Sequence, residues 1–470
     1  MRSLFSTVLL TIVSISMAWS TPQLSFAPSY QRGMSSNSMS TIIWDGTDLW
    51  AASGSGLSRS LGVPETALDW IFFTEDDGLP TDIIPALTAS NGRVFISSAS
   101  YLDQETSYTL DFGNGITVSD DRGETWETRS LDRAEGLGNI CWQLASIGDT
   151  LWAACWNGLA DHVYPSGIAV STDAGETWSF PDISAILGPS TFSVAARGTE
   201  CWVGTGAGIG ITKDLGETWT ASNYAENDLS GDWVVALGLP PGDTLTAWAA
   251  TRRIPDIGSG SAYGIDGISV TMDGGENWIT PGDLEGITAW DFAFRGDSIW
   301  IAAEEGLAFS PDGGSSWNIL DIDDGLPRET FYSIEIVGDR IYAGSSDGLV
   351  WSKDSGQTWE VMLASQPQGT ADTPRTYCYP NPFSPSRNQE ARIRYNLAES
   401  GRIYLHIFDF AENTIRKVVD GEIRELGELL FEVWDGRDDG GRIVPNGTYF
   451  YKLWTDAGAD ASYGKIMVLD

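Results

Sequence analysis

One eight-residue pattern recurs six times and constrains the fold of this chain more than any other feature. Each copy begins with Ser or Thr, has Asp at its third position and Gly at its fifth, and ends on Trp. The Asp and Trp positions are Asp121 and Trp126, Asp173 and Trp178, Asp214 and Trp219, Asp273 and Trp278, Asp312 and Trp317, and Asp354 and Trp359. Successive tryptophans, counted from a degenerate seventh copy that ends at Trp70, lie 39 to 59 residues apart. A period of about 40 residues with variable insertions is typical of propeller blades.

Each copy closes a repeat of four short strands. An apolar strand lies upstream of the box, as in Leu151–Ala154 and Ile299–Ala302, and a glycine-bounded strand such as Gly167–Val170 leads into it. Short runs bounded by glycine and polar turns are typical of strands rather than helices. Seven such repeats can close into a ring that leaves few sheet edges exposed. We therefore predict an all-β chain in which residues 21–365 form a seven-bladed β-propeller.

The residue types of the box fit a tight turn. Glycine adopts backbone conformations that other residues resist, and the Asp and Ser or Thr side chains can accept hydrogen bonds from turn amides. The Trp begins the outer strand and can pack between blades. We therefore expect the box residues to be structural rather than catalytic. The boxes resemble the Asp-box, or BNR, repeats of sialidases and of many non-enzymatic bacterial propellers, a resemblance that implies the fold but not sialidase activity.

The N-terminus has the pattern of a secretory signal peptide. A short basic start is followed by a largely apolar stretch, Leu4–Met17, and by the small-x-small sequence Ala18-Trp19-Ser20. We predict that residues 1–20 are a signal peptide, that no lipid anchor follows, and that the mature chain has no membrane span. The protein is therefore expected to be secreted or held at the cell surface.

The C-terminal residues differ in composition and in motif. A polar linker at 366–376 precedes a strand-rich region, 377–470, that carries Tyr379–Phe383, Trp434–Asp438 and Val444–Gly447. These motifs resemble those of the immunoglobulin-like domain of flagellar hook-capping proteins and of the C-terminal sorting domains of type IX secretion cargo. The resemblance implies a small immunoglobulin-like β-sandwich that engages the secretion machinery or attaches the protein. An accessory module without such a role is the alternative.

The charge of the chain is strongly acidic and uneven. The net charge is -38, and residues 21–373 hold 14 basic and 50 acidic side chains, whereas the region from 375 onward holds 12 and 15. Nucleic acids and anionic membranes need a basic face, so they are excluded as expected partners. A protein or a glycan partner at the cell envelope remains open.

Cysteine and histidine are scarce, with four and two copies. Cys141 and Cys155 flank a predicted strand–turn–strand, so either they form a disulfide across neighbouring strands or they are buried thiols. No spacing predicts a zinc site. We expect no cofactor; Ca²⁺ stays open because of the acidity, although Asp321–Gly325 lacks the alternating ligand spacing of a calcium loop.

Three repeats carry long insertions between their second and third strands, and these loops should share one face of the ring. They span 100–114, 157–166 and 251–266. Long loops on a rigid scaffold are the usual place for recognition, so we predict a ligand-binding face there, with surface decoration as the alternative. The candidate residues are Tyr101, Asp103, Glu105, Tyr108, His162, Tyr164, Arg252, Arg253 and Tyr263.

An enzymatic site is not evident. A sialidase-type site needs three arginines around a substrate carboxylate, a Tyr–Glu nucleophile pair and an Asp. The sequence Arg253-Ile254-Pro255 matches a sialidase motif in letters but follows three intact boxes instead of preceding the first. No catalytic residue is therefore assigned. The leading hypothesis is a non-enzymatic binding or scaffold protein, and the alternative is an Asp-box glycoside hydrolase.

Overall fold

The computed structural model describes residues 31–470 with several gaps. The gaps are 54, 101–111, 132–139, 156–166, 184–189, 254–263, 305, 322–323, 325, 328, 365–375, 380–382, 386–389, 398–399, 412, 425–426, 457–460 and 470. Within the described ranges no helix has the length and apolar character needed to cross a bilayer.

Antiparallel strands dominate the described chain, and their first seven sheets follow one another in sequence. The first three sheets contain β1 (Gln31–Arg32), β2 (Thr41–Trp44), β3 (Leu49–Ser53), β4 (Gly56–Ser60) and β5 (Trp70–Phe73); β6 (Ala86–Ser90), β7 (Arg93–Ser100), β8 (Phe112–Ser119) and β9 (Glu127–Arg129); and β10 (Cys141–Ile147), β11 (Thr150–Cys155) and β12 (Gly167–Ser171). The next four contain β13 (Thr191–Arg197), β14 (Glu200–Thr205), β15 (Gly208–Thr212) and β16 (Thr220–Ser222); β17 (Val234–Gly238), β18 (Ala247–Thr251) and β19 (Gly267–Thr271); β20 (Ala289–Arg295), β21 (Ser298–Ala303), β22 (Gly306–Ser310) and β23 (Asn318–Leu320); and β24 (Phe331–Val337), β25 (Arg340–Ser345), β26 (Gly348–Ser352) and β27 (Glu360–Met362). The short helices are η1 (Ala67–Asp69), η2 (Glu75–Asp77), α2 (Tyr224–Asn227) and η3 (Gly282–Leu284).

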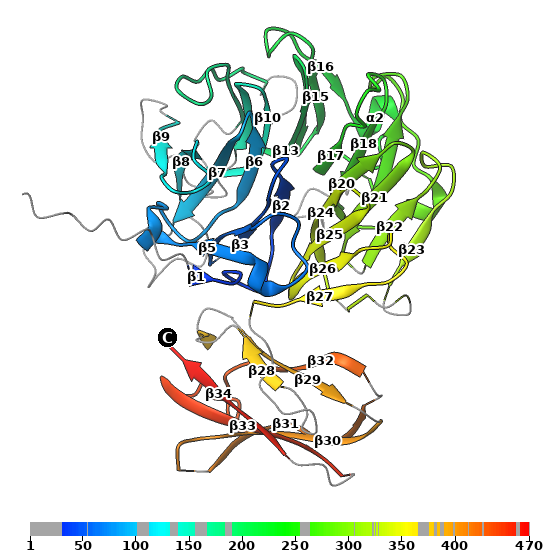
Figure 1. Cartoon of the computed structure of the whole chain (residues 1–470). Helices are drawn as coiled ribbons and strands as arrows, with labels where there is room; N and C mark the ends of the chain where they lie inside the picture. Colours follow the sequence, from blue (N-terminus) through cyan, green and yellow to red (C-terminus); the bar gives the residue numbers. More distant parts are fainter. Residues whose placement is uncertain are drawn as a thin grey trace, which may run out of the picture.

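The first long strand of each sheet lies at the centre of a ring (Figure 1). These inner strands, β2, β6, β10, β13, β17, β20 and β24, contact one another in that order, and β24 contacts β2 again. The sheets therefore close around a central axis and form a β-propeller. Closure leaves few exposed strand edges, as expected from the repeats.

Neighbouring sheets are held together by paired aromatic rings. The second strand of every sheet carries one buried large aromatic residue: Trp50, Phe95, Trp152, Trp202, Trp248, Trp300 and Tyr342. In five cases this ring lies edge-on to the box tryptophan of the next sheet, with centroids 5.4 to 6.4 Å apart: Trp50–Trp126, Trp152–Trp219, Trp202–Trp278, Trp248–Trp317 and Trp300–Trp359. Each such pair contributes about 0.5–1.5 kcal/mol beyond the burial of its area.

The Asp of each intact box has the same hydrogen-bond pattern, whereas the indole bond varies: Trp278, for example, donates to the Ser222 hydroxyl. In the second intact copy the Asp173 carboxylate accepts bonds from the amide and the hydroxyl of Thr177, at 2.8 and 2.6 Å, and from the Ser171 hydroxyl at 2.7 Å. These bonds lower the pKa of Asp173 to about 2. The Trp178 indole donates to the Gly175 carbonyl at 3.1 Å. The turn is therefore closed by its own side chains.

The box glycine is required by space as well as by conformation. Gly356 has a φ of 88°, and a Cβ there would lie 2.3 Å from the Trp300 ring of the preceding sheet. An L-residue would therefore be strained and would displace the ring that joins the two sheets. The sequence pattern and the packing between sheets thus depend on the same residue.

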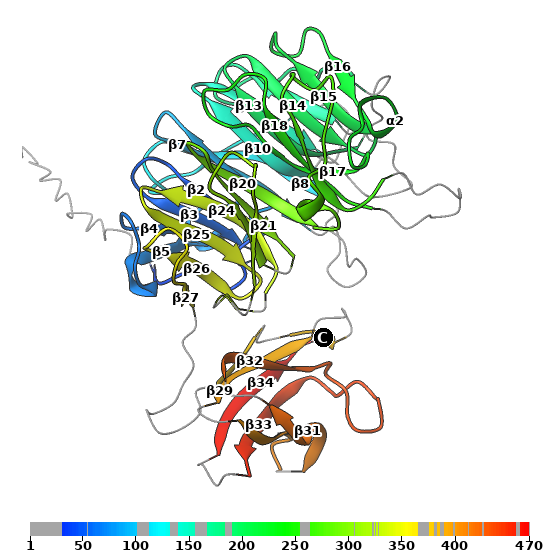
Figure 2. The ribbon, with the colours of Figure 1, turned by 90° about the vertical axis from the view of Figure 1, so that its right-hand side faces the viewer.

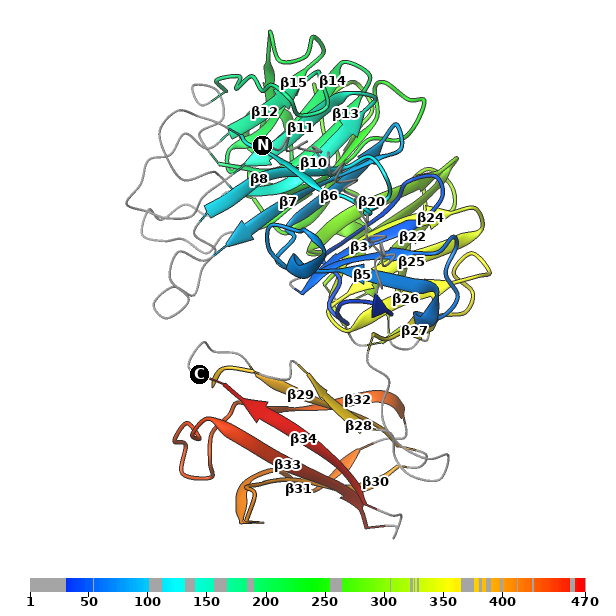
Figure 3. The same cartoon turned by 60° about the vertical axis from the view of Figure 1, so that its left-hand side comes forward.

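Two further sheets form a C-terminal module, defined here as residues 376–468. The strands are β28 (Thr376–Tyr379), β29 (Ala391–Leu397) and β32 (Gly427–Trp434) in one sheet, and β31 (Thr414–Arg424), β30 (Gly401–Phe408), β33 (Gly447–Thr455) and β34 (Ser462–Val468) in the other. Both sheets contribute to one core, which includes Ile393, Leu405 and Trp434. The sheet of β28, β29 and β32 lies nearer the propeller (Figures 1 and 3).

A buried arginine of β29 joins the module to the propeller. The Arg394 guanidinium forms ion pairs with Glu329, which precedes β24, and with Asp347, in the turn between β25 and β26. The side chains of all three are at most 2% exposed. The Asn37 side chain donates a hydrogen bond to the Asp347 carboxylate at 3.0 Å, so the segment before β2 also takes part in this contact. We call Arg394, Glu329 and Asp347 the interdomain triad; Figure 2 shows the module beneath the end of the propeller that carries β26 and β27.

Candidate binding pocket

Five of the seven inner strands begin with a β-bulge. The pairing register slips by one residue after the first position of β10, β13, β17, β20 and β24, whereas β2 and β6 pair without a break. The residues inserted at the bulges are Trp142, Phe192, Val235, Trp290 and Tyr332. Because a bulge bends its strand and redirects a side chain, these positions need not follow the inward–outward alternation of a regular strand.

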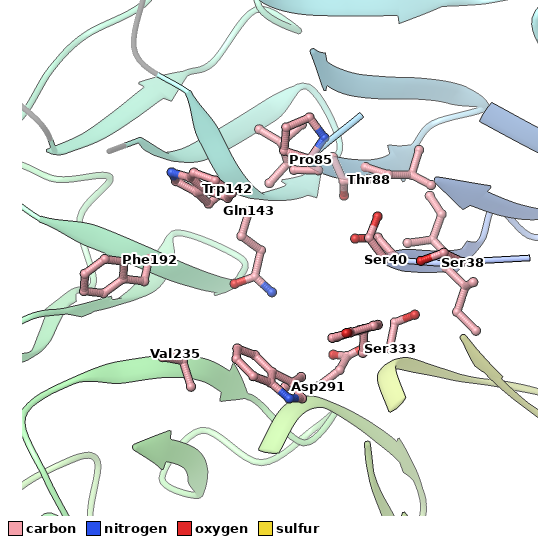
Figure 4. Close-up of a pocket in the computed structure, with 18 of the residues that line it drawn as sticks. Ser38, Ser40, Pro85, Thr88, Trp142, Gln143, Phe192, Val235, Asp291 and Ser333 are labelled. Atoms are coloured by element: carbon pink, nitrogen blue, oxygen red, sulfur yellow. The ribbon is translucent and has the colours of Figure 1, made fainter. Parts of the chain in front are cut away.

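All five bulge residues line one central cavity of about 790 Å³. This volume lies within the usual range of small-molecule and cofactor pockets. The other lining residues are Ser38, Ser40, Thr41, Ile42, Ile43, Pro85, Ala86, Leu87, Thr88, Gln143, Leu144, Trp233, Arg252, Asp291 and Ser333. Figure 4 shows Trp142 and Phe192 on one side of the cavity, facing Ser38 and Ser40 across it. The cavity, called the central pocket below, therefore has an aromatic side and a side of small residues.

The aromatic side is packed and contains one cation. The rings of Phe192 and Trp233 are 4.9 Å apart. The Arg252 guanidinium lies 5.3 Å from the ring centroid of Trp290 and 3.6 Å from the Glu304 carboxylate. This arrangement is a cation–π contact with a nearby counter-charge.

Polar side chains behind the bulges connect three pairs of neighbouring sheets. Gln143 accepts a hydrogen bond from the Val194 amide at 2.8 Å, and Asp291 accepts one from the Ile334 amide at 2.9 Å. Glu335 accepts one from the Trp44 amide at 3.1 Å and so links the last sheet to the first. Burial raises the pKa of Asp291 and of Glu335 to about 7.

Two polar atoms of the pocket wall have no hydrogen-bond partner among the described residues. They are the Trp290 indole nitrogen and the Ser333 hydroxyl, and both atoms are buried. A buried donor without a partner costs about 1–3 kcal/mol. A ligand whose acceptor atoms reach these two groups would remove this cost.

Of the predicted ligand-binding residues, the structure describes only Arg252 and Arg253. Arg252 lines the central pocket, whereas Arg253 is exposed and its amide donates to Asp266 at 2.7 Å. Tyr101, Asp103, Glu105, Tyr108, His162, Tyr164 and Tyr263 lie outside the described residues. The strand ends that border the insertions are at the pocket end of the ring, because Ser97 pairs with Ala86, Cys155 with Cys141 and Thr251 with Val234.

The aromatic bulges were missed in the sequence analysis, although a signal was present. Each follows a small or apolar residue and precedes a polar one at the start of an inner strand, as in Cys141-Trp142-Gln143 and Ala289-Trp290-Asp291. The regular alternation of inward and outward side chains along a strand does not predict that such a ring faces the central pocket. None of the box Asp and Trp residues is among the pocket-lining residues.

Cys141 and Cys155 lie next to each other in the structure. Cys141 and Cys155 are directly opposite on β10 and β11, and both are buried. Their sulfurs lie 2.9 Å apart, which exceeds the about 2.05 Å of a disulfide bond. In this geometry the two sulfurs are in contact, and this contact together with burial raises the pKa of Cys141. The disulfide stays a prediction.

The pocket lacks the groups of a sialidase-type site. Arg252 is the one arginine among its lining residues, so no three-arginine cluster forms in the described wall. Elsewhere in the described ranges, no group of three His, Cys, Asp or Glu side chains could hold a metal ion.

Comparison with known proteins supports the fold. No family model matches the chain. The chain is 28% identical over 264 residues to the photosystem II assembly lipoprotein Ycf48 of Synechococcus sp. (strain CC9902). The aligned region covers 48% of this chain and 76% of the relative. Among solved structures, a GH74 enzyme of Niastella koreensis is similar with a TM-score of 0.55 at 14% identity, over 94% of this chain and 74% of that one. Ycf48 bound to a D1 peptide is similar with a TM-score of 0.47 at 17% identity, over 68% and 94%.

Proposed function

We propose that this chain is an exported, non-enzymatic binding or scaffold protein whose central pocket holds a segment of a protein partner. In this proposal the propeller has seven Asp-box blades and the C-terminal module is an immunoglobulin-like domain. The observation that carries the proposal is the aromatic side of the pocket, which four of the five bulge residues build. Aromatic side chains provide large contact area at low entropic cost and dominate recognition sites.

The polar groups of the pocket favour binding over catalysis. Asp291 accepts bonds from two backbone amides, at 2.8 and 2.9 Å, so its oxygens already serve the structure. Glycoside hydrolysis commonly needs two carboxyl groups at the substrate, and Asp291 is the one carboxyl residue among the described lining residues. The relative named as an assembly lipoprotein agrees with a binding role.

Export and attachment complete the proposal. The signal peptide at 1–20 would direct the chain across the inner membrane, and the module would mediate sorting or attachment at the cell surface. A buried interdomain triad is suited to hold such a module in one orientation.

Glycoside hydrolysis is the second candidate, because the Asp291 carboxyl group in the pocket has a pKa raised to about 7 and could donate a proton.

One screen separates the binding function from glycoside hydrolysis. The mature protein is tested against glycoside substrates and against an array of peptides, together with Trp142→Ala and, as a matched control, Tyr463→Ala on the module. Trp142 lies in the pocket and is 38% exposed, and Tyr463 is 65% exposed.

Peptide binding that only Trp142→Ala weakens, with no glycoside cleaved, is the expected result. Glycoside cleavage that Asp291→Asn abolishes would instead establish the enzyme. Peptide binding that both variants leave unchanged would contradict the pocket as the binding site.

A further inference from the structure

We propose that the partner segment is a basic peptide, in which Lys or Arg side chains flank an apolar residue and lie against the aromatic side of the central pocket. This inference rests on the proposed function and adds the chemistry of the partner. Three features of the described structure carry it: the charge of the propeller, the position of Arg252, and the two polar atoms without partners.

The charge of the propeller selects cations. With 14 basic against 50 acidic residues between 21 and 373, the propeller repels anionic segments and attracts cationic ones. The pocket is apolar and aromatic rather than acidic, so the charge acts by steering and the contacts are made by rings. Complementary charge of this kind raises the rate of association and disfavours the wrong partners.

The pocket already holds a cation of its own. Arg252 stacks on Trp290 with a separation of 5.3 Å and is balanced by Glu304 at 3.6 Å. The other aromatic bulge residues, Trp142, Phe192 and Tyr332, line the same cavity from other strands. A Lys or Arg side chain of a partner could use these ring faces as Arg252 uses Trp290.

The polar atoms of the wall fit the backbone of a peptide. The Trp290 indole nitrogen can only donate, and the Ser333 hydroxyl can donate or accept. Peptide carbonyl oxygens are acceptors, so a segment that binds against Trp290 and Ser333 could satisfy both groups. A cation near Asp291 would also favour the charged form of that carboxyl group.

The test is a selection from a random library of 12-residue peptides displayed on phage, with the full mature protein as bait. Counter-selection uses Val235→Trp, which places a large ring on a bulge residue of the pocket wall. Circular dichroism and thermal unfolding establish that the variant is folded, and Phe192→Ala, which removes a ring instead of adding one, serves as the second pocket variant.

The selected peptides decide both proposals separately. Pocket-dependent peptides enriched in Lys and Arg around an apolar residue are expected. Their affinity should fall as salt rises, and it should fall about threefold to tenfold for Trp290→Phe, which keeps a ring but removes the donor. Pocket-dependent peptides that are neutral, acidic or insensitive to salt would overturn the basic segment and leave the proposed function standing. A selection that yields no pocket-dependent peptide would overturn both.

Discussion

Replacing Arg394 with Ala should release the C-terminal module from the propeller. The change removes the guanidinium that Glu329 and Asp347 share, although their side chains are only 1% and 0% exposed in the docked arrangement. Removing one partner of a buried ion pair costs about 3–5 kcal/mol. Because undocking lets water reach both carboxylates, the cost should appear as separation of the domains instead of unfolding of the propeller.

The expected shift in the docking equilibrium is roughly a hundredfold to several thousandfold, since each 1.4 kcal/mol is about a factor of ten. Double electron–electron resonance can measure it, with nitroxides on cysteines introduced at Leu245 and Tyr463, which are 52% and 65% exposed. The native cysteines should react little, because Cys201 is buried and burial raises the pKa of Cys378 to about 12.

The wild type should give one narrow distance distribution and Arg394→Ala a broad one. Arg392→Ala is the matched control on the same strand, because Arg392 is 37% exposed and lies 3.5 Å from Glu329. Partly exposed pairs contribute only about 0–1 kcal/mol, so this control should keep the narrow distribution. A narrow distribution retained in Arg394→Ala would refute the role given to the triad.

Two further predictions concern the propeller. Gly356→Ala should lower the free energy of unfolding by about 1–3 kcal/mol, because the backbone at Gly356 is left-handed and the new Cβ would meet the Trp300 ring. Gly282→Ala is the control and should change the free energy of unfolding little, because no atom lies near the position of its Cβ. Urea unfolding measures both variants, and equal effects would contradict the role given to the Trp300 contact. Burial raises the pKa of Asp291 to about 7, so the folded chain binds more protons than the unfolded chain between about pH 4 and 7, and stability should fall as the pH rises through that window. Asp291→Asn should reduce the change in the free energy of unfolding between pH 4 and 8, by at most about 4 kcal/mol. An unchanged pH dependence of this free energy would show that Asp291 does not titrate in that window.

The sequence predicted the propeller because its constraints are local. Each box closes its own turn, as Asp173 does with Ser171 and Thr177, so residue type and spacing are sufficient to recognise it. The pairing of five box tryptophans with the preceding sheet follows once the repeats are stacked. The strand-rich C-terminal module was instead expected from the resemblance of its motifs to those of known domains.

The pocket and the triad could not be predicted in the same way. Trp142 and Trp290 face the cavity because bulges shift their strands, and a bulge is a property of strand pairing rather than of residue type. In β29, Arg394 alternates with buried apolar residues and so has the pattern of a solvent-facing side chain. It is buried where it meets Glu329 and Asp347 of the propeller, and the alternation within β29 does not predict that contact.

The central claim is that the partner binds in the central pocket, and site-specific photo-crosslinking tests it most directly. Phe192 is replaced by p-benzoylphenylalanine in the exported protein, with the same replacement at Tyr463 as the control position. The account predicts that illumination joins the Phe192 position to a protein, that mass spectrometry finds one defined segment of it, and that adding Val235→Trp abolishes the product. Crosslinks only from Tyr463, or pocket crosslinks that Val235→Trp leaves unchanged, would contradict the claim.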